Sequence, residues 1–184
     1  MEAFVTSTLL VALAEIGDKT QLLSFLLAAR LRRPWVIISG ILVATVANHA
    51  LAGWIGAWLS TLAQPQTLRW IVGGTFILFG LWILKPDELD DTGFRLHPAG
   101  AWVTTVIVFF LAEMGDKTQF ATVALAARFD SLFQVVIGTT AGMMLANVPA
   151  VLIGEKLAGR LPLHLTRLVA ACFFFLTGIV TLLY

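Results

Sequence analysis

Two short segments, AEIGDKTQ and AEMGDKTQ, hold the residues of this sequence that are best suited to chemistry. They occupy residues 14–21 and 112–119, and each interrupts a long apolar stretch with two acids and a lysine. If these stretches lie in a membrane, each unpaired charge costs about 2.5–3.5 kcal/mol, and six of them cost roughly 15–20 kcal/mol. That sum exceeds the stability of a typical domain, about 5–15 kcal/mol. The charged groups should therefore face one another, a water-filled cavity or a bound ion.

The spacing of the charges predicts that they share one side of a helix. Glu15, Asp18 and Lys19 stand at i, i+3 and i+4, which is one face of a continuous helix. The second segment repeats this pattern with Glu113, Asp116 and Lys117. If the two faces meet, four carboxylates and two ammonium groups carry a net charge of −2, which suits one divalent cation. In the structural alternative, each glutamate pairs with its own lysine at i+4, and both aspartates remain unpaired in a dry interior.

Oxygen atoms are the main ligands that these segments offer to an ion. Hard oxygen donors suit Mg, Ca and Mn, whereas Zn and Cu favour imidazole and thiolate. The candidate metal ligands are Glu15, Asp18, Glu113 and Asp116. The candidate supporting residues are Lys19, Thr20, Gln21, Asn48, Lys117, Thr118, Gln119 and Asn147, together with Gly17 and Gly115. The glycines would let helices approach closely or let the backbone loosen beside the ion.

Two further residues with reactive side chains have simpler interpretations. His49 has Val148 as its counterpart in the second half of the chain, and we interpret it as a helix-packing or cavity residue. The single cysteine, Cys172, excludes an intramolecular disulfide and any cysteine-based metal site, and we interpret it as an apolar filler.

The composition predicts an all-α integral membrane protein. The chain is 59% hydrophobic and 12% charged, whereas soluble domains have about 45–50% apolar and about 25% charged residues. So few charged residues cannot cover the surface of a soluble globular protein. The net charge of +1 gives no reason to expect nucleic acid as a partner. The N-terminus lacks the basic region of a signal peptide, since Glu2 is its only early charge, so we expect an uncleaved first span. No cofactor is expected.

Six segments are long and apolar enough to span a bilayer, which takes about 20 residues. We expect them at about 3–28, 35–61, 67–85, 100–127, 132–155 and 164–184. The stretch KPDELDDTGFRLHP contains proline, glycine and acids, which mark a solvated linker. We therefore expect a three-helix repeat at 1–85, an acidic linker at 86–98 and a second three-helix repeat at 99–184. The linker contains four acids: Asp87, Glu88, Asp90 and Asp91. They could attract cytoplasmic cations, but we interpret them as part of a solvated connection between the halves.

The two halves are copies that should have opposite orientations. Residues 28–30 and 126–128 both read AAR, at the same offset of 98 as the acidic segments, and Asn48 matches Asn147 at an offset of 99. Because each half has three spans, an odd number, the second half must insert upside down. Many secondary transporters have such inverted repeats, with the substrate site near the midplane between them.

The basic residues predict the orientation, since cytoplasmic loops are enriched in lysine and arginine. Eight basic residues fall on one side of the six expected spans: Arg30, Arg32, Arg33, Lys85, Arg95, Lys156, Arg160 and Arg167. Only Arg69 and Arg128 fall on the other side. We therefore expect the first side, with the acidic linker, to be cytoplasmic and both termini to be outside.

The clustered acids also predict how transport is coupled. When the metal leaves, carboxylates held together in a low dielectric repel one another and should take up protons. Metal and protons then compete for one site, and competition combined with alternating access makes an antiporter.

Two copies of E-x-G-D-K-[ST] in six spans, with an acidic central loop, closely resemble the uncharacterised protein family 0016. The resemblance covers the whole chain, and neither motif departs from the family pattern. It implies exchange of a divalent cation, Mn²⁺ or Ca²⁺, for protons at a metal site on the two motifs. The family includes bacterial manganese exporters and Golgi manganese/calcium transporters. The short chain is similar to prokaryotic members, which favours export of Mn²⁺ across the plasma (inner) membrane.

Two other classes of function are less consistent with the sequence. An intramembrane enzyme could use paired carboxylates as acid and base, but Ser24 and Ser39 have no matching histidine, and an enzyme rarely needs two inverted copies of one motif. A structural or assembly protein would tolerate Glu113→Gln, whereas a transporter would not. We therefore expect a Mn²⁺/H⁺ antiporter, with Ca²⁺/H⁺ exchange as the alternative, and not an enzyme.

Overall fold

The protein is an all-helical membrane protein. A computed structural model describes residues 1–85, 97, 99–153 and 163–183, and within these residues it contains helices and no β-strand, as the composition predicts. In chain order the helices are α1 (Glu2–Glu15), α2 (Lys19–Leu31), α3 (Pro34–Leu62), α4 (Pro65–Trp82), α5 (Ala101–Glu113), α6 (Lys117–Arg128), α7 (Leu132–Ile153) and α9 (Leu163–Leu183).

The predicted first and fourth spans are each broken into two helices, so the prediction of continuous helices was wrong. The segment 3–28 divides into α1 and α2, and the segment 100–127 divides into α5 and α6. The break falls at the glycine of each motif, because Gly17 has φ +82° and Gly115 has φ +75°. A right-handed helix cannot continue through such a residue, and glycine adopts this conformation without the steric cost of a side chain. The charged residues therefore lie around a helix break and not along one helical face.

The ends of the unbroken helices follow ordinary signals in the sequence. Pro34 and Pro65 lie in the first turns of α3 and α4, where the missing N–H of proline would have no partner within the helix. α2 ends where Arg32 adopts a left-handed conformation with φ +52°, and its N–H bonds to the carbonyl of Ala28. Among the residues that the structure describes, three helical segments are long and apolar enough to cross a membrane: Pro34–Leu62, Leu132–Ile153 and His164–Leu183.

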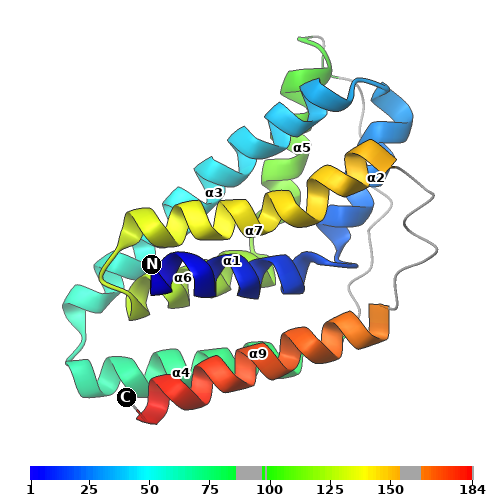
Figure 1. Cartoon of the computed structure of the whole chain (residues 1–184). Helices are drawn as coiled ribbons and strands as arrows, with labels where there is room; N and C mark the ends of the chain where they lie inside the picture. The colour runs from blue at the N-terminus through cyan, green and yellow to red at the C-terminus, as the bar shows by residue number, and fades with distance from the viewer. Residues whose placement is uncertain (86–96, 98, 154–162, 184) are drawn as a thin grey trace.

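Each broken helix packs against the long helix of the other half. α1 and α2 contact α7, whereas α5 and α6 contact α3, and α3 also contacts α7 (Figure 1). α4 and α9 form a pair that lies against α1 and α6. Gly73 and Gly178 allow this close pairing, because a Cβ at Gly178 would lie 2.9 Å from the carbonyl oxygen of Gly73. The motif of one half is thus held by helices of both halves.

Both termini lie at the same end of the molecule (Figure 1). The amino group of Met1 donates to Oε1 of Gln134, which lies near the start of α7, at 3.0 Å. Arg69, near the start of α4, donates to the carbonyl of Leu182 at 2.7 Å. The α3–α4 and α6–α7 connections therefore share this end with the termini. The acids predicted to form the linker at 86–98 lie outside the described residues, as do Lys156 and Arg160.

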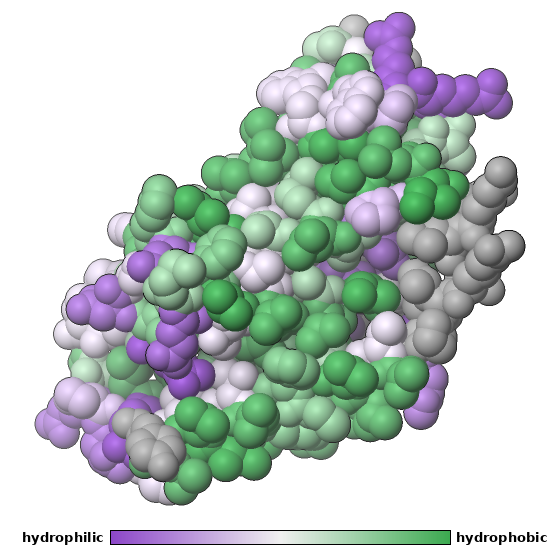
Figure 2. All heavy atoms as spheres, in the orientation of Figure 1, coloured by the Kyte–Doolittle hydropathy of each residue, from purple (hydrophilic) through white to green (hydrophobic). Residues whose placement is uncertain are grey.

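The outer surface is apolar, as a lipid-facing surface should be. Figure 2 shows apolar side chains along the helices of one face, with polar side chains gathered mainly towards the ends. Exposed apolar side chains include Trp54 on α3, Leu145 on α7 and Leu176 and Ile179 on α9. Exposed side chains of this size are unfavourable in water, so they support burial of these helices in a bilayer.

Candidate metal-binding site

The two motif glutamates are fully buried at the ends of their helices. Glu15 is the last residue of α1 and Glu113 the last residue of α5, and both are 0% exposed. Such an end concentrates carbonyl groups and partial negative charge, so a carboxylate is unfavourable there. The unfavourable placement of two glutamates at such ends would be offset by a bound cation.

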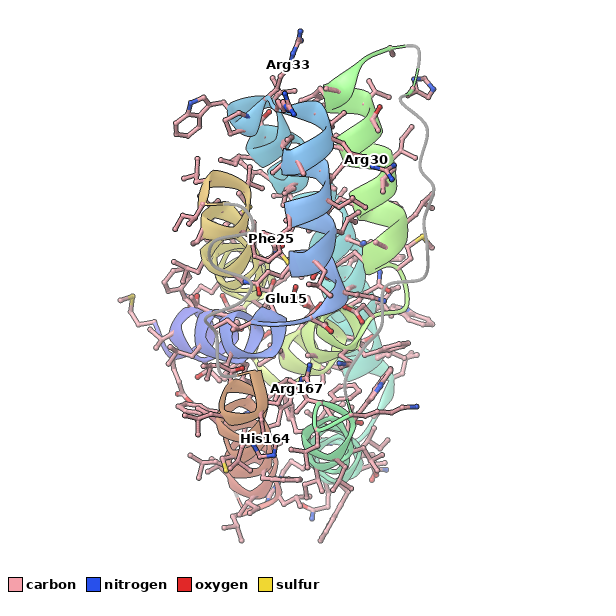
Figure 3. The ribbon with its side chains drawn as sticks, turned by 90° about the vertical axis from the view of Figure 1, so that its right-hand side faces the viewer. Glu15, Phe25, Arg30, Arg33, His164 and Arg167 are labelled. Atoms are coloured by element: carbon pink, nitrogen blue, oxygen red, sulfur yellow. The ribbon has the colours of Figure 1, made fainter. Side chains whose placement is uncertain are left out.

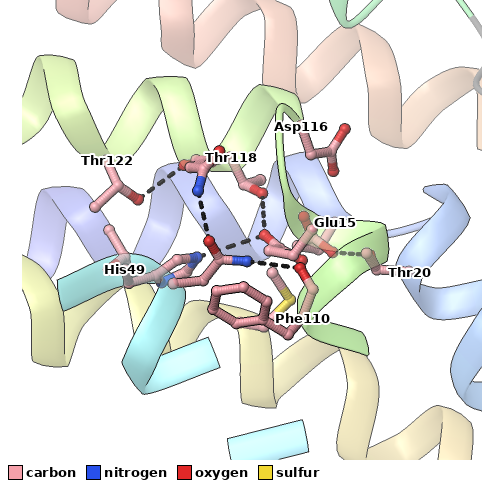
Figure 4. A network of polar contacts seen from close by, with 12 residues as sticks. Glu15, Thr20, His49, Phe110, Asp116, Thr118 and Thr122 are labelled. Atoms are coloured by element: carbon pink, nitrogen blue, oxygen red, sulfur yellow. Dashed lines mark hydrogen bonds and ion pairs between the residues drawn. The ribbon is translucent and has the colours of Figure 1, made fainter. Parts of the chain in front are cut away.

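A threonine of the following helix holds each glutamate. Thr20 donates its hydroxyl to Oε2 of Glu15, and Thr118 donates to Oε1 of Glu113 at 2.7 Å (Figure 4). In the described part of the chain, Oε1 of Glu15 and Oε2 of Glu113 have no hydrogen-bond partner. A buried oxygen without a partner is costly, so each glutamate keeps one oxygen available to a ligand.

Three carboxylates from the two motifs meet in one place. One oxygen each from Glu15, Glu113 and Asp116 lies within 4.8 Å of the others, and all three residues are buried. Oxygen ligands bind Mg²⁺ or Ca²⁺ at about 2.0–2.6 Å, so two ligands on opposite sides of one ion are about 4–5 Å apart. The separation fits a single divalent ion. Figure 3 shows Glu15 near the middle of the molecule.

The fourth predicted ligand, Asp18, lies beside a lysine and is not a member of this three-carboxylate group. Nζ of Lys117 lies 3.5 Å from Oδ1 of Asp18, and Nζ of Lys19 lies 3.2 Å from Oδ1 of Asp116. Each ion pair joins the lysine of one motif to the aspartate of the other. The structural alternative, in which both aspartates lack a lysine, therefore does not describe this site.

The motif glutamines stabilise the two helix breaks. The N–H of Gly17 donates to Oε1 of Gln21 at 2.9 Å, and that of Gly115 donates to Oε1 of Gln119 at 2.7 Å. Each glutamine then donates to the long helix of the other half: Gln21 to the carbonyl of Ala146, and Gln119 to Oδ1 of Asn48. The predicted supporting residues thus position the backbone around the carboxylates.

The two matched asparagines connect the long helices to the motif of the other half. Asn48 on α3 donates to the carbonyl of Phe110 on α5 at 3.1 Å. Asn147 on α7 accepts from the hydroxyl of Ser24 on α2 at 2.7 Å and donates to the carbonyl of Met143. These contacts join α3 to α5, which ends at Glu113, and α7 to α2, which follows the first helix break.

His49 is the residue near the site that the sequence analysis set aside. Its side chain is fully buried, and its Nε2 lies 3.5 Å from Oε1 of Glu113 (Figure 4). Val148, at the matching position of α7, has no polar group, so the repeat gave no signal for a histidine. The available signal was its position directly after Asn48 in the sequence.

The chain is similar over most of its length to several known proteins. The family model described as "Divalent cation/proton antiporter GDT1" matches residues 3–91 and 101–184. A protein of Vibrio cholerae named "Putative manganese exporter" is 49% identical over 182 residues, which cover 98% of this chain and 90% of that protein. A GDT1-like protein of Synechocystis is 30% identical over 201 residues, covering 98% of this chain and 97% of that protein. GDT1-like protein 5 of Arabidopsis thaliana is 26% identical over 221 residues, covering 100% and 96%. No solved structure matches the chain.

Proposed function

Because the chain belongs to the GDT1 family of divalent cation/proton antiporters, we propose that it exports Mn²⁺ from the cytoplasm in exchange for protons. The protein is a transporter and not an enzyme. The observation that carries the proposal is the buried group formed by Glu15, Glu113 and Asp116, whose oxygens lie within 4.8 Å of one another. These residues come from both motifs, so one ion would be held between the two halves.

The same carboxylates couple the metal to protons. With an ion bound, the divalent charge neutralises acids that are crowded in a buried space. When the ion leaves, the carboxylates repel one another in a low dielectric, and protons would replace the metal. Asp18 and the two lysines balance the remaining charge through their cross-motif ion pairs. Metal and protons would therefore occupy the site in turn.

The transport path requires an orientation in the membrane. We infer six crossings in two inverted repeats, residues 1–85 and 99–184, with both termini outside and the linker at 86–98 in the cytoplasm. The placement of the termini beside the α3–α4 and α6–α7 connections supports this arrangement (Figure 1). Figure 3 views the molecule from the side opposite the termini, with Arg33 and Arg30 in its upper part and Arg167 below the middle. Their positive charge would face the cytoplasm.

Manganese is the preferred cargo and Ca²⁺ the second candidate. The name of the Vibrio cholerae relative favours manganese, and export would then proceed across the plasma (inner) membrane. Calcium remains the alternative because carboxylate oxygens are also its usual ligands. The flux of both ions should therefore be measured in the same vesicles.

The proposal is tested by reconstituting the full chain in liposomes that contain a dye sensitive to Mn²⁺ and Ca²⁺, with an imposed pH gradient. We expect Mn²⁺ flux that follows the proton gradient and is lost in Glu113→Gln. Glu2→Gln is the matched control. It makes the same glutamate-to-glutamine change at an exposed position, the first residue of α1, away from the carboxylate group. Flux of neither ion in folded protein would contradict the transport proposal, and flux of Ca²⁺ alone would contradict manganese as cargo.

A further inference from the structure

His49 is a buried polar residue whose hydrogen-bonding groups are not used by the described residues. Its side chain is 0% exposed, and neither Nδ1 nor Nε2 has a hydrogen-bond partner in the part of the chain that the structure describes. Buried polar atoms without partners are rare in native structures and usually indicate a ligand, water or ion. The position of the imidazole therefore suggests a ligand.

The imidazole lies at the edge of the carboxylate group. Nε2 is 3.5 Å from Oε1 of Glu113, which is longer than a normal N–H···O hydrogen bond of about 2.7–3.2 Å. Two adjacent ligands that each lie about 2.0–2.3 Å from one ion are roughly 3 Å apart. A small adjustment would therefore let His49 and Glu113 share a metal ion.

The histidine is not a requirement of the repeated architecture. Val148 occupies the matching sequence position on α7, so the corresponding residue of the other half is apolar. Thr45, one helical turn before His49 on α3, is also fully buried, and its hydroxyl has no partner among the described residues. The face of α3 that carries Thr45 and His49 therefore holds buried polar groups that helix packing does not require, and His49 on this face lies next to Glu113.

We propose that His49 is a nitrogen ligand of the transported ion and that it favours Mn²⁺ over Ca²⁺. The inference rests on the proposed function, since it concerns the ion held by the three carboxylates. Ca²⁺ takes oxygen ligands almost exclusively, whereas imidazole strengthens binding of first-row transition ions. One histidine among carboxylates would thus raise the affinity for Mn²⁺ without a matching gain for Ca²⁺.

Pulsed electron paramagnetic resonance of Mn²⁺ bound to the purified full chain tests this inference directly, because a coordinated imidazole couples its ¹⁴N nucleus to the metal. We expect this coupling in the wild type and in His164→Gln, whose histidine is exposed on α9. We expect it to disappear in His49→Gln. Absence of ¹⁴N coupling in wild type with Mn²⁺ bound, or its persistence in His49→Gln, would overturn the proposal. The wild-type spectrum decides even if the variant fails to fold.

Equilibrium binding of the two ions gives the second readout. Changes around metal sites typically alter affinity by about 10–100-fold, so His49→Gln should weaken Mn²⁺ binding at least about tenfold. The Kd for Ca²⁺ should change less than about twofold, because Ca²⁺ does not need the nitrogen. His164→Gln, the same change at the exposed start of α9, should alter neither. Equal losses for both ions would overturn the selectivity role, whereas a wild type that binds no Mn²⁺ would contradict the proposed function itself.

Discussion

The two motifs have almost the same sequence but different surroundings. The glutamate and threonine pair in the same way in both, and so do the glycine and glutamine. The long helices differ beside the two motifs: Asn48 and His49 on α3 approach Gln119 and Glu113 of the second motif, whereas α7 has Val148 at the sequence position that matches His49. The repeat therefore accounts for the shared carboxylates, whereas the long helix of the other half decides which further polar side chains lie near them.

The exposure of the motifs differs as well. The side chain of Lys19 is 25% exposed and that of Lys117 only 5%. Gly17 is buried, whereas Gly115 is exposed, and Gly17 lines a small pocket together with Ile83, next to the end of α4, and Arg167 on α9. Matched substitutions in the two motifs should therefore have unequal effects.

The aspartates provide the largest expected difference. Asp116→Asn should weaken Mn²⁺ binding by about 100-fold or more, because it removes a member of the three-carboxylate group. Asp18→Asn should weaken binding by only about tenfold, because Asp18 lies beside Lys117 and outside that group. Isothermal titration with Mn²⁺ checks both. Equal losses would mean that all four acids bind the ion directly.

The pH dependence of Mn²⁺ binding tests the competition with protons. If one proton replaces the ion, the apparent Kd should rise up to about tenfold for each unit by which the pH falls. The buried group of Glu15, Glu113 and Asp116 is the reason, since protons and metal would occupy the same oxygens. Binding measured between mild acid and mild base checks this direction, and a Kd independent of pH would exclude competition at this site.

The lysines should differ in their effect on folding. Lys117→Met should lower the free energy of unfolding by about 3 kcal/mol, because it removes a buried charge beside Asp18. Lys19→Met should cost about 1 kcal/mol or less, because solvent screens a partly exposed ion pair. Thermal unfolding of the two variants in detergent, without metal, measures these losses. A larger loss of stability in Lys19→Met than in Lys117→Met would contradict the prediction.

The glycine at the second helix break gives the smallest effect. Gly115→Ala should lower the free energy of unfolding by about 1–2 kcal/mol, because φ is +75° there although no atom would lie within 4 Å of the new Cβ. Gly74→Ala, inside α4 and equally free of neighbours, should raise it by about 0.5–1 kcal/mol. If the free energy of unfolding changed in the same direction in Gly115→Ala and Gly74→Ala, the positive φ at Gly115 would not explain the effect of Gly115→Ala.

The sequence predicted the helical class, and three of its four candidate ligands lie together in the structure, but their local geometry was not predicted. Repetition and the cost of charges in an apolar segment were sufficient to identify both motifs. The helix breaks were not predicted, because spacing at i, i+3 and i+4 is equally compatible with a continuous helix and glycine is tolerated in membrane helices. The pairs between Lys19 and Asp116 and between Lys117 and Asp18 depend on tertiary packing.

His49 shows a second limit of reasoning from the repeat. Because the matching residue in the second half is the apolar Val148, we interpreted His49 as a packing residue. Comparison of the two halves identifies only residues that occur in both. A residue that lies beside the carboxylates in one half alone can be found only once α3 is placed against Glu113. The repeat therefore identified the shared carboxylates and concealed what distinguishes the two motifs.

The central claim is that both motifs hold one ion together. The most direct measurement is the number of Mn²⁺ ions bound per chain, by equilibrium dialysis, in the wild type, Glu15→Gln and Glu113→Gln. A shared site predicts one ion in the wild type and loss of that ion in either variant, because both glutamates belong to the same group. Two ions in the wild type, with one retained in each variant, would contradict the account and indicate two independent sites.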